Sequence, residues 1–305
     1  MSFEVTILGN SSATPAPNRH PSAQYLKILD HHILIDCGEG TQMQLQAYKI
    51  KKSRISQIFI SHVHGDHILG LPGLLLSMNL MRRETPMHIY GPKELFEMLD
   101  VFFKYSETKF SFDMHYHTVN TEKEEVIFEN IYYKVTTFPI YHRIPCVGFK
   151  FRERSVLRKL NVESCEKYKI PFTHFNDIKM GKDFVSSDGK IVIKNDELTF
   201  DPGIPMSYAY CSDTIYDERV IKAVEDADIL YHEATFMHDK LERAIETMHT
   251  TAKQAGIIAS KAHVKKLIIG HFSARYDDLQ PLLEEAKTEF PNTEIATEGK
   301  VFVIE

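Results

Sequence analysis

The sequence predicts an α/β fold in which helices cover the faces of β-sheets. Runs rich in β-branched and aromatic residues alternate along the chain with stretches of helical periodicity. The 305 residues, of which 43% are hydrophobic, are sufficient to bury a large core. Potential metal ligands also recur just past the ends of strand-like runs. Alternation of this kind indicates sheets packed against helices.

The hydrophobic pattern divides into two βα halves on either side of a central segment. In the first half it predicts strands at about 3–8, 23–28, 31–36, 55–60 and 87–90, and helices at 40–48, 66–81 and from Pro92. Further strands are predicted near 112–118, 125–138 and 145–152. In the second half, strands near 207–212, 228–232, 265–270 and 300–304 alternate with helices near 216–226, 237–246, 250–262 and 277–289.

Four side chains that can bind metal lie within six residues, directly after the predicted strand 55–60. These are His62, His64, Asp66 and His67. Two histidines at i and i+2 of a tight loop can turn both imidazoles toward one ion, while Asp66 and His67 begin the next element and face a second ion. An isolated histidine is most often a surface or core residue, but four such residues at a strand-to-helix junction predict half of a two-metal site.

Two ions need about seven protein ligands, so the motif predicts partners elsewhere in the chain. Three candidates each follow a strand-like run: His142, Asp213 and His271. Taken alone, His142 or His271 would be a capped or solvent-facing histidine, and Asp213 could be a helix N-cap. The recurrence of suitable ligands at three strand ends favours metal binding.

Together these motifs resemble the metallo-β-lactamase superfamily and, within it, the ribonuclease Z family of tRNA 3′-processing endonucleases. The resemblance covers nearly the whole chain and rests on the segments Leu8–Pro15 with Arg19, Leu34–Gln42, Ser61–His67, Cys211–Thr214, His232–Thr235, His249–Ala252 and Gly270–Tyr276. The histidine motif identifies only the superfamily. The segments His232–Thr235 and His249–Ala252 distinguish ribonuclease Z from its hydrolase relatives.

The resemblance implies a four-layer αββα sandwich formed by residues 1–305 as a single domain, with the metals at one edge of the two sheets. It implies one zinc ion held by His62, His64 and His142, a second held by Asp66, His67 and His271, and Asp213 as the bridging carboxylate. Mn or Fe can also occupy sites made of His and Asp. Within the site, Asp66 is expected to orient or deprotonate the attacking water.

The resemblance also assigns roles in proton transfer and substrate binding. His249, oriented by Glu233, is expected to protonate the leaving 3′-oxygen. Without their flanking motifs, these two residues would be interpreted as a helix cap and a buried ion pair. The flanking segments His232–Thr235 and His249–Ala252 favour the catalytic role instead. Ser273 and Arg275 are expected to hold the scissile phosphate.

An inserted basic arm is expected at 152–196, where the family carries its tRNA-binding segment. From Lys150 to Lys182 the chain has nine basic and four acidic residues, a net charge of +5 in a protein of −6. The ordinary alternative is a solvated surface excursion. Many bacterial relatives have a Gly-Pro-rich stretch here ending in Leu-Lys-x-Gly. This chain preserves only the end, Ile178–Gly181, so Lys179 is expected to bind substrate.

The remaining features indicate a cytoplasmic enzyme. The start of the chain lacks a signal-peptide pattern, and no apolar run reaches the roughly 18 residues of a membrane span. The four scattered cysteines, without a CxxC pair, are expected to be buried reduced thiols. By resemblance we expect a homodimer in which each subunit's arm serves the other's active site, with precursor tRNA as the substrate.

Two alternatives stay open at this point. Another metallo-β-lactamase-fold phosphodiesterase or esterase, acting on small substrates, would keep the metals and lack the arm. A non-catalytic nucleic-acid-binding module would have lost part of the ligand set, and the seven candidate ligands argue against it.

Overall fold

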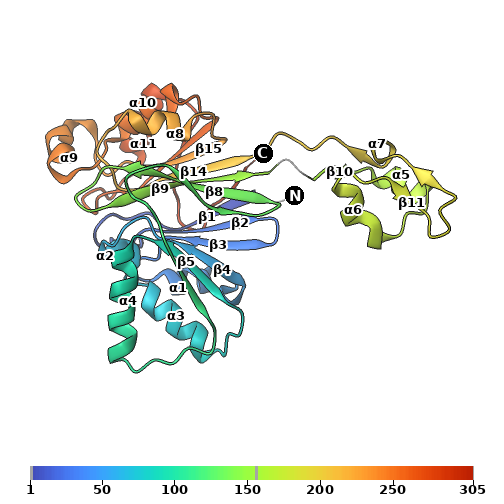
Figure 1. The fold of residues 1–305 in the computed structure, drawn as a ribbon. Helices are drawn as coiled ribbons and strands as arrows, with labels where there is room; N and C mark the ends of the chain where they lie inside the picture. Colours follow the sequence, from blue (N-terminus) through green and yellow to red (C-terminus); the bar gives the residue numbers. More distant parts are fainter. Residues whose placement is uncertain (1–2, 155–156, 305) are drawn as a thin grey trace.

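The computed structural model describes residues 3–154 and 157–304. Within them the elements form four layers in the order helices, sheet, sheet, helices (Figure 1). This confirms the αββα sandwich that the family resemblance implied.

The first sheet of the described chain has seven strands and contains most of the N-terminal half. Its spatial order is β18 (Val301–Val303), β1 (Phe3–Gly9), β2 (Ala23–Ile28), β3 (His31–Ile35), β4 (Ile55–Phe59), β5 (Met87–Gly91) and β6 (Met114–Thr118). Strands β3 to β6 run parallel. The helical elements of this half are α1 (Thr41–Ala47), η1 (Lys52–Arg54), α2 (Gly65–Ile68), α3 (Leu71–Leu80) and α4 (Lys93–Tyr105).

The second sheet, also of seven strands within the described residues, carries most of the C-terminal half. Its order is β17 (Thr293–Ile295), β16 (Lys266–Gly270), β15 (Ile229–Glu233), β14 (Ser207–Cys211), β9 (Cys146–Glu153), β8 (Tyr133–Ile140) and β7 (Glu125–Glu129). Strands β14 to β17 run parallel, so their carboxyl ends lie at one edge. The helical elements of this half are α8 (Arg219–Val224), η3 (His238–Lys240), α9 (Leu241–Thr247), α10 (Ala252–Lys261) and α11 (Gln280–Glu289).

Three hydrophobic cores hold the layers together. Aromatic side chains such as Phe59, Phe149 and Tyr208 fill the space between the two sheets. A second core lies between the first sheet and helices α1, α3 and α4, and a third lies between the second sheet and helices α8, α10 and α11. The site at the sheet edge is therefore mounted on strands that are packed on both faces.

A small lobe projects from the sandwich between β9 and β14 (Figure 1). Its elements are β10 (Lys159–Leu160), α5 (Val162–Lys167), η2 (Phe172–His174), α6 (Phe175–Lys179), β11 (Phe184–Val185), β12 (Val192–Ile193), α7 (Asn195–Leu198) and β13 (Thr199–Phe200). A separate hydrophobic cluster that includes Cys165, Ile178 and Leu198 packs its interior. We call residues 157–205 the arm lobe.

Some predicted elements differ from those observed, for local physical reasons. The predicted helix 66–81 is two helices, because the Gly70 amide donates to the Cys37 carbonyl oxygen outside the helix and Pro72 has no N–H to donate. The predicted strand 125–138 is a hairpin, since the Asn130 side chain accepts hydrogen bonds from the amides of Tyr132 and Tyr133 and turns the chain. The pattern did not predict β17.

The structure bears on two other expectations. All four cysteines are free thiols with buried side chains, as predicted. Among the described residues, no helix has the length and apolar character needed to cross a bilayer.

Candidate metal centre and active site

Side chains from four strand ends meet at one edge of the sandwich. The loop after β4 supplies the histidine motif, and His142, Asp213 and His271 follow β8, β14 and β16. Their ligand atoms form two groups in which all atoms lie within 4.8 Å of one another: His62, His64, His142 and Asp213, and Asp66, His67, Asp213 and His271. The structure thus brings all seven predicted ligands together, and Asp213 belongs to both groups.

The two carboxylate oxygens of Asp213 face different groups. Oδ2 lies 3.7 Å from His62 Nε2 and 3.8 Å from His142 Nε2. Oδ1 lies 3.4 Å from His67 Nε2 and 3.1 Å from His271 Nε2. This arrangement suits a carboxylate that bridges two cations.

Hydrogen bonds on the far side of the rings fix which nitrogen faces the centre. His142 Nδ1 lies 2.9 Å from the Met248 carbonyl oxygen, which can only accept, so Nδ1 carries the proton and Nε2 presents a lone pair. His67 Nδ1 donates likewise to Asp36 Oδ2 at 2.8 Å. Such outer partners orient histidines for metal binding.

The residues fit a divalent cation because they otherwise leave polar atoms unsatisfied. Asp213 Oδ1 is buried and, among the described residues, accepts no hydrogen bond, although His271 Nε2 lies 3.1 Å and His67 Nε2 3.4 Å away. Burial alone would lower the pKa of His67, but Asp213, Asp66 and Asp36 raise it well above the usual value. The carboxylates therefore attract positive charge to the centre, and imidazole with carboxylate is a donor set for transition-metal ions.

Asp36 is a residue of the candidate site that the sequence did not single out. It is fully buried and accepts hydrogen bonds from His67 Nδ1, the Ser61 amide and hydroxyl, and the Tyr210 hydroxyl. Its backbone is left-handed, with φ of 53°. The available signal was its place at the end of a strand within Leu34–Gln42, but its partner His67 could be identified only from the fold.

Glu233 and His249 form a second buried arrangement next to the metal groups. Glu233 is fully buried and accepts from His249 Nδ1 at 2.9 Å. Four further donors hold the same carboxylate: the amides of Thr214, Thr235 and Thr250 and the Thr235 hydroxyl. The His249 ring lies 4.9 Å from that of His142 and 5.4 Å from that of His271.

This arrangement favours the protonated form of His249. Burial alone would lower its pKa, but the charge and hydrogen bond of Glu233 outweigh burial and raise the pKa to about 9. With Nδ1 held by Glu233, Nε2 is the nitrogen available to a bound molecule. The pair has the geometry of a general acid and its orienting carboxylate.

A cavity of about 400 Å³ opens onto both the metal groups and His249. It is lined by Ser12, Ala13, His64, Gly65, Asp66, Leu69, His142, Arg143, Asp213, Arg243, Thr247 and His249. Asp66 is fixed in its wall by the Ala13 amide, which donates to Asp66 Oδ2 at 2.7 Å. A substrate in this cavity would meet the candidate ligands and the candidate proton donor together.

The predicted substrate contacts are not among the residues lining this cavity. Arg275 lies beside it, with its guanidinium 4.9 Å above the Phe236 ring and Nε 3.1 Å from Ser273 Oγ. Phe236 in turn lies against His249, with ring centroids 6.1 Å apart.

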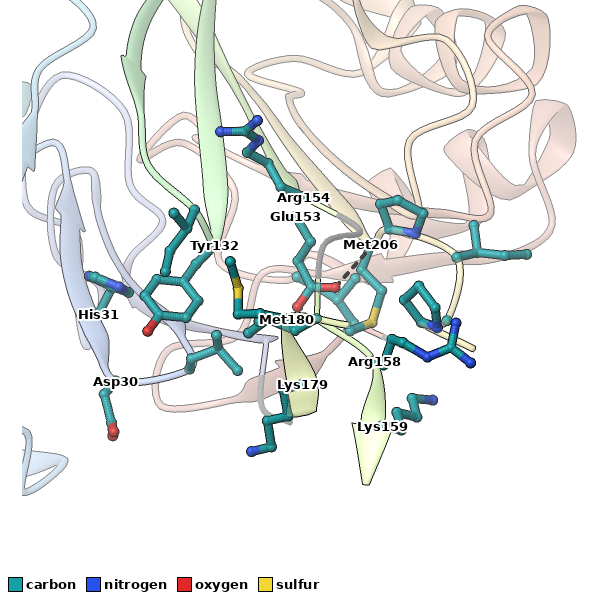
Figure 2. Close-up of a pocket in the computed structure, with 18 of the residues that line it drawn as sticks. Asp30, His31, Tyr132, Glu153, Arg154, Arg158, Lys159, Lys179, Met180 and Met206 are labelled. Atoms are coloured by element: carbon teal, nitrogen blue, oxygen red, sulfur yellow. Dashed lines mark hydrogen bonds between the residues drawn. The ribbon is translucent and has the colours of Figure 1, made fainter. Parts of the chain in front are cut away.

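Lys179 lies in a different and larger cavity, of about 1400 Å³, at the base of the arm lobe. Figure 2 shows Lys179 on the same side of this cavity as Arg158 and Lys159. Tyr132 and Met206 also line the cavity. The eight residues of β9 lead from the metal edge to this base, about 26 Å at ~3.3 Å per residue. Lys179 and the metal groups are therefore at opposite ends of the second sheet.

The charge of the arm lobe depends on where the segment is cut. Residues 157–205 contain eight basic residues (Arg158, Lys159, Lys167, Lys169, Lys179, Lys182, Lys190, Lys194) and eight acidic residues (Glu163, Glu166, Asp177, Asp183, Asp188, Asp196, Glu197, Asp201). The lobe is therefore neutral overall. The excess within 150–182 arises because Lys150 and Arg152 lie on β9 and the acidic return segment falls outside that window.

Known proteins resemble this chain over its whole length. A ribonuclease Z of Bacteroides fragilis is 44% identical over 297 residues, covering 97% of each protein. A ribonuclease Z of Cytophaga hutchinsonii is also 44% identical and covers 100% of this chain and 97% of that protein. The chain belongs to the ribonuclease Z family.

Solved structures agree with this assignment of fold and family. The short form of human tRNase Z superposes with a TM-score of 0.73 at 26% identity, covering 99% of both chains. The metallo-β-lactamase fold protein YhfI from Bacillus subtilis, at 20% identity, shares the fold with a TM-score of 0.71 over 99% of this chain and 100% of that one.

A family model described as anti-Pycsar protein Apyc1 matches residues 3–164. This range includes the histidine motif and His142 but ends before Asp213, Glu233, His249 and His271. The ribonuclease Z relatives cover those residues as well, so they define the family of the complete site.

Proposed function

We propose that the chain is a metal-dependent endoribonuclease that removes the 3′ trailer from precursor tRNA in the cytoplasm and leaves a 3′-hydroxyl on the tRNA. The observation that carries the proposal is one carboxylate, Asp213, that belongs to both candidate ligand groups and lies beside the buried Glu233–His249 pair. Membership of the ribonuclease Z family supports the same reaction. Buried free thiols are in keeping with a reducing compartment.

We assign two zinc ions to the two ligand groups, since five of the seven donors are imidazoles. His62, His64 and His142 would hold one ion, Asp66, His67 and His271 the other, and Asp213 would contact both. When bound, such ions activate water and neutralise charge on the phosphate.

The protein's own residues orient the reactants. Asp66, fixed by the Ala13 amide, faces the cavity and can align the attacking water or accept its proton. His249 enters the reaction protonated and donates to the departing 3′-oxygen, while Glu233 stabilises the cationic ring before the transfer. Ser273 and Arg275, beside Phe236, hold the scissile phosphate.

The arm lobe is proposed to grip the body of the tRNA through Lys179 and its neighbours Arg158 and Lys159. Its base lies about 26 Å from the metal edge, the length of β9 at ~3.3 Å per residue. An arm directed away from its own catalytic edge can serve a second copy of the chain. We therefore propose a homodimer in which each arm lobe holds tRNA bound at the partner's active site.

The test is cleavage of a 3′-extended precursor tRNA by purified protein, with and without a chelator, followed by mapping of both new ends. We expect one cut that leaves a 3′-hydroxyl on the tRNA and a 5′-phosphate on the trailer, abolished by chelation and restored by zinc. Metal analysis should give two ions per chain. Cleavage of small phosphodiesters alone, with precursor tRNA intact, would favour the alternative phosphodiesterase.

A further inference from the structure

Two arginines that were not selected from the sequence line the catalytic cavity. Arg143 and Arg243 contribute to the same wall as Thr247 and His249. Arg143 directly follows His142, and Arg243 lies on α9, six residues before His249. Both side chains are exposed to solvent at this rim.

Hydrogen bonds join these arginines into one unit with the site. Arg143 Nη2 donates to the Glu246 carbonyl oxygen at 3.4 Å, and Arg243 Nη1 donates to Glu246 Oε2 at 2.6 Å. Met248 caps the C-terminal end of α9; its backbone is left-handed, with φ of 57°, and its carbonyl oxygen accepts a hydrogen bond from His142 Nδ1. The end of α9 that presents His249 is therefore linked by hydrogen bonds to both Arg143 and Arg243.

A phosphodiester suits this pair better than a neutral group. A guanidinium offers a planar fork of donors that matches two phosphate oxygens. The competing partner, the Glu246 carboxylate, is 66% exposed, and ion pairs at such positions contribute little. A phosphate can therefore replace Glu246 as the partner of Arg243 at small cost.

The positions of the attacking water and the leaving oxygen indicate which phosphate of the RNA the two arginines would bind. In an in-line displacement the water attacks opposite the leaving oxygen, so Asp66 and Asp213 mark the attacking side and His249 marks the leaving side. Arg143 and Arg243 line the same cavity as His249 and are hydrogen-bonded to Glu246, three residues before it, so we place them on the leaving side. The next backbone phosphate in that direction is the one on the 5′ side of that nucleoside.

We propose that Arg143 and Arg243 bind the phosphodiester immediately 5′ of the nucleoside whose 3′-oxygen departs, and so set the register of the cut. This inference rests on the proposed function. It assigns the pair to substrate positioning, separate from the metal groups and from Ser273 and Arg275 at the scissile phosphate.

The test combines side-chain and substrate changes. Arg243→Gln, Arg143→Gln and the double variant should each lower kcat/KM for precursor tRNA, by about ten- to a hundredfold for the double variant. Lys240→Gln is the matched control, since Lys240 is exposed beside the same helix, pairs with Asp239, and is not among the cavity-lining residues. Hydrolysis of a nitrophenyl phosphodiester without a second phosphate should fall much less in the arginine variants than cleavage of precursor tRNA does.

A neutral linkage locates the contact. A 2′-deoxy methylphosphonate at the proposed phosphate, compared with a 2′-deoxy phosphodiester there, should slow the unaltered protein about as much as the double variant does. On the methylphosphonate substrate, the double variant should cleave only slightly more slowly than the unaltered protein does. The assignment would be overturned if the effects of the methylphosphonate and of the double variant were fully additive at that position. It would also be overturned if the two effects were non-additive only when the methylphosphonate replaces a phosphate of the trailer.

One substitution should improve the enzyme. Glu246→Gln removes the carboxylate that competes for Arg243 and should raise kcat/KM for precursor tRNA, whereas a decrease would contradict phosphate binding by Arg243. If the unaltered protein fails to cut precursor tRNA at all, the proposed function falls as well. Normal cutting combined with unaffected arginine variants would overturn only this inference.

Discussion

The two ends of the β9–β14 strand pair differ in how they hold charge. At the metal end, Asp36 and Glu233 are fully buried, and each accepts four or more hydrogen bonds from groups fixed by the fold. At the arm end, the charged pairs Lys182–Asp177 and Lys194–Asp183 lie on the surface of the lobe. The first set is rigid and desolvated, and the second is exposed and screened by salt.

Under the proposed function, this difference separates catalysis from tRNA binding. Buried, fully bonded carboxylates hold ligands and the proton donor in place before substrate arrives, which is what catalysis requires. Exposed lysines on a small lobe give attraction that is weak for each contact and adjustable, which suits binding of a large folded RNA. Substitutions at the two ends should therefore affect different steps.

The largest effect is expected from Asp213→Ala. This change removes the carboxylate shared by both ligand groups. Loss of an outer hydrogen-bond partner of a metal ligand lowers activity by up to about a hundredfold, and loss of the shared ligand itself should lower cleavage by more than that. The metal content should fall as well. Asp66→Ala should be comparably severe. Asp239→Ala, at an exposed position, is the control. Near-normal turnover by Asp213→Ala with both metals retained would contradict the shared-ligand assignment.

His249→Ala should slow cleavage by roughly two to four orders of magnitude, the usual contribution of one general acid, with unchanged metal content. Glu233→Gln should lose less, and the double variant little more than His249→Ala, because the two residues act as a unit. A nitrophenolate leaving group needs no proton and should largely rescue His249→Ala. Failure of that rescue would assign His249 to positioning of the substrate.

Asp36→Asn should weaken metal binding without removing a ligand. The neutral amide keeps the shape of Asp36 but loses a charged acceptor for His67 Nδ1, so affinity should fall about ten- to a hundredfold. Chelator competition followed by metal analysis measures this. Unchanged affinity in a folded variant would show that the hydrogen bond to His67 is not important for metal binding.

The smallest effect is expected from Lys179→Ala in the arm lobe. If Lys179 contacts one phosphate, the slope of log K against log salt should become shallower by about 0.7 to 0.9. Lys182→Ala is the matched control, since Lys182 is exposed on the same lobe but does not line the cavity that Lys179 lines. Equal changes in the two variants would indicate general electrostatic attraction.

The metal end was more predictable from sequence than the arm end. Each candidate ligand follows its own strand, so local pattern alone located His142, Asp213 and His271, and the fold then brought them together. Asp36 was missed because its role depends on lying beside Ser61 and His67, which is a property of neighbouring strands and not of local sequence.

At the arm end, a count of charged residues along the sequence did not predict the net charge of the lobe. Nine basic residues in 150–182 suggested a basic lobe, yet two of them, Lys150 and Arg152, belong to β9 in the main sheet. Short elements such as β10 and α7 have too few residues for periodicity to reveal them. The bounds 152–196 and the role of the lobe in tRNA binding stay predictions.

Replacement of residues 157–204 by a short Gly-Ser connection tests most directly whether tRNA binding and catalysis are located in separate parts of the molecule. Kinetics of this variant should be compared with those of the unaltered protein on precursor tRNA and on a nitrophenyl phosphodiester. We predict weaker tRNA binding with a shallower salt dependence, and small-ester hydrolysis within about twofold of the original, because the metal edge lies about 26 Å from the deletion, the length of β9. Unchanged tRNA binding, or parallel loss of both activities in a folded, metal-loaded variant, would contradict the account.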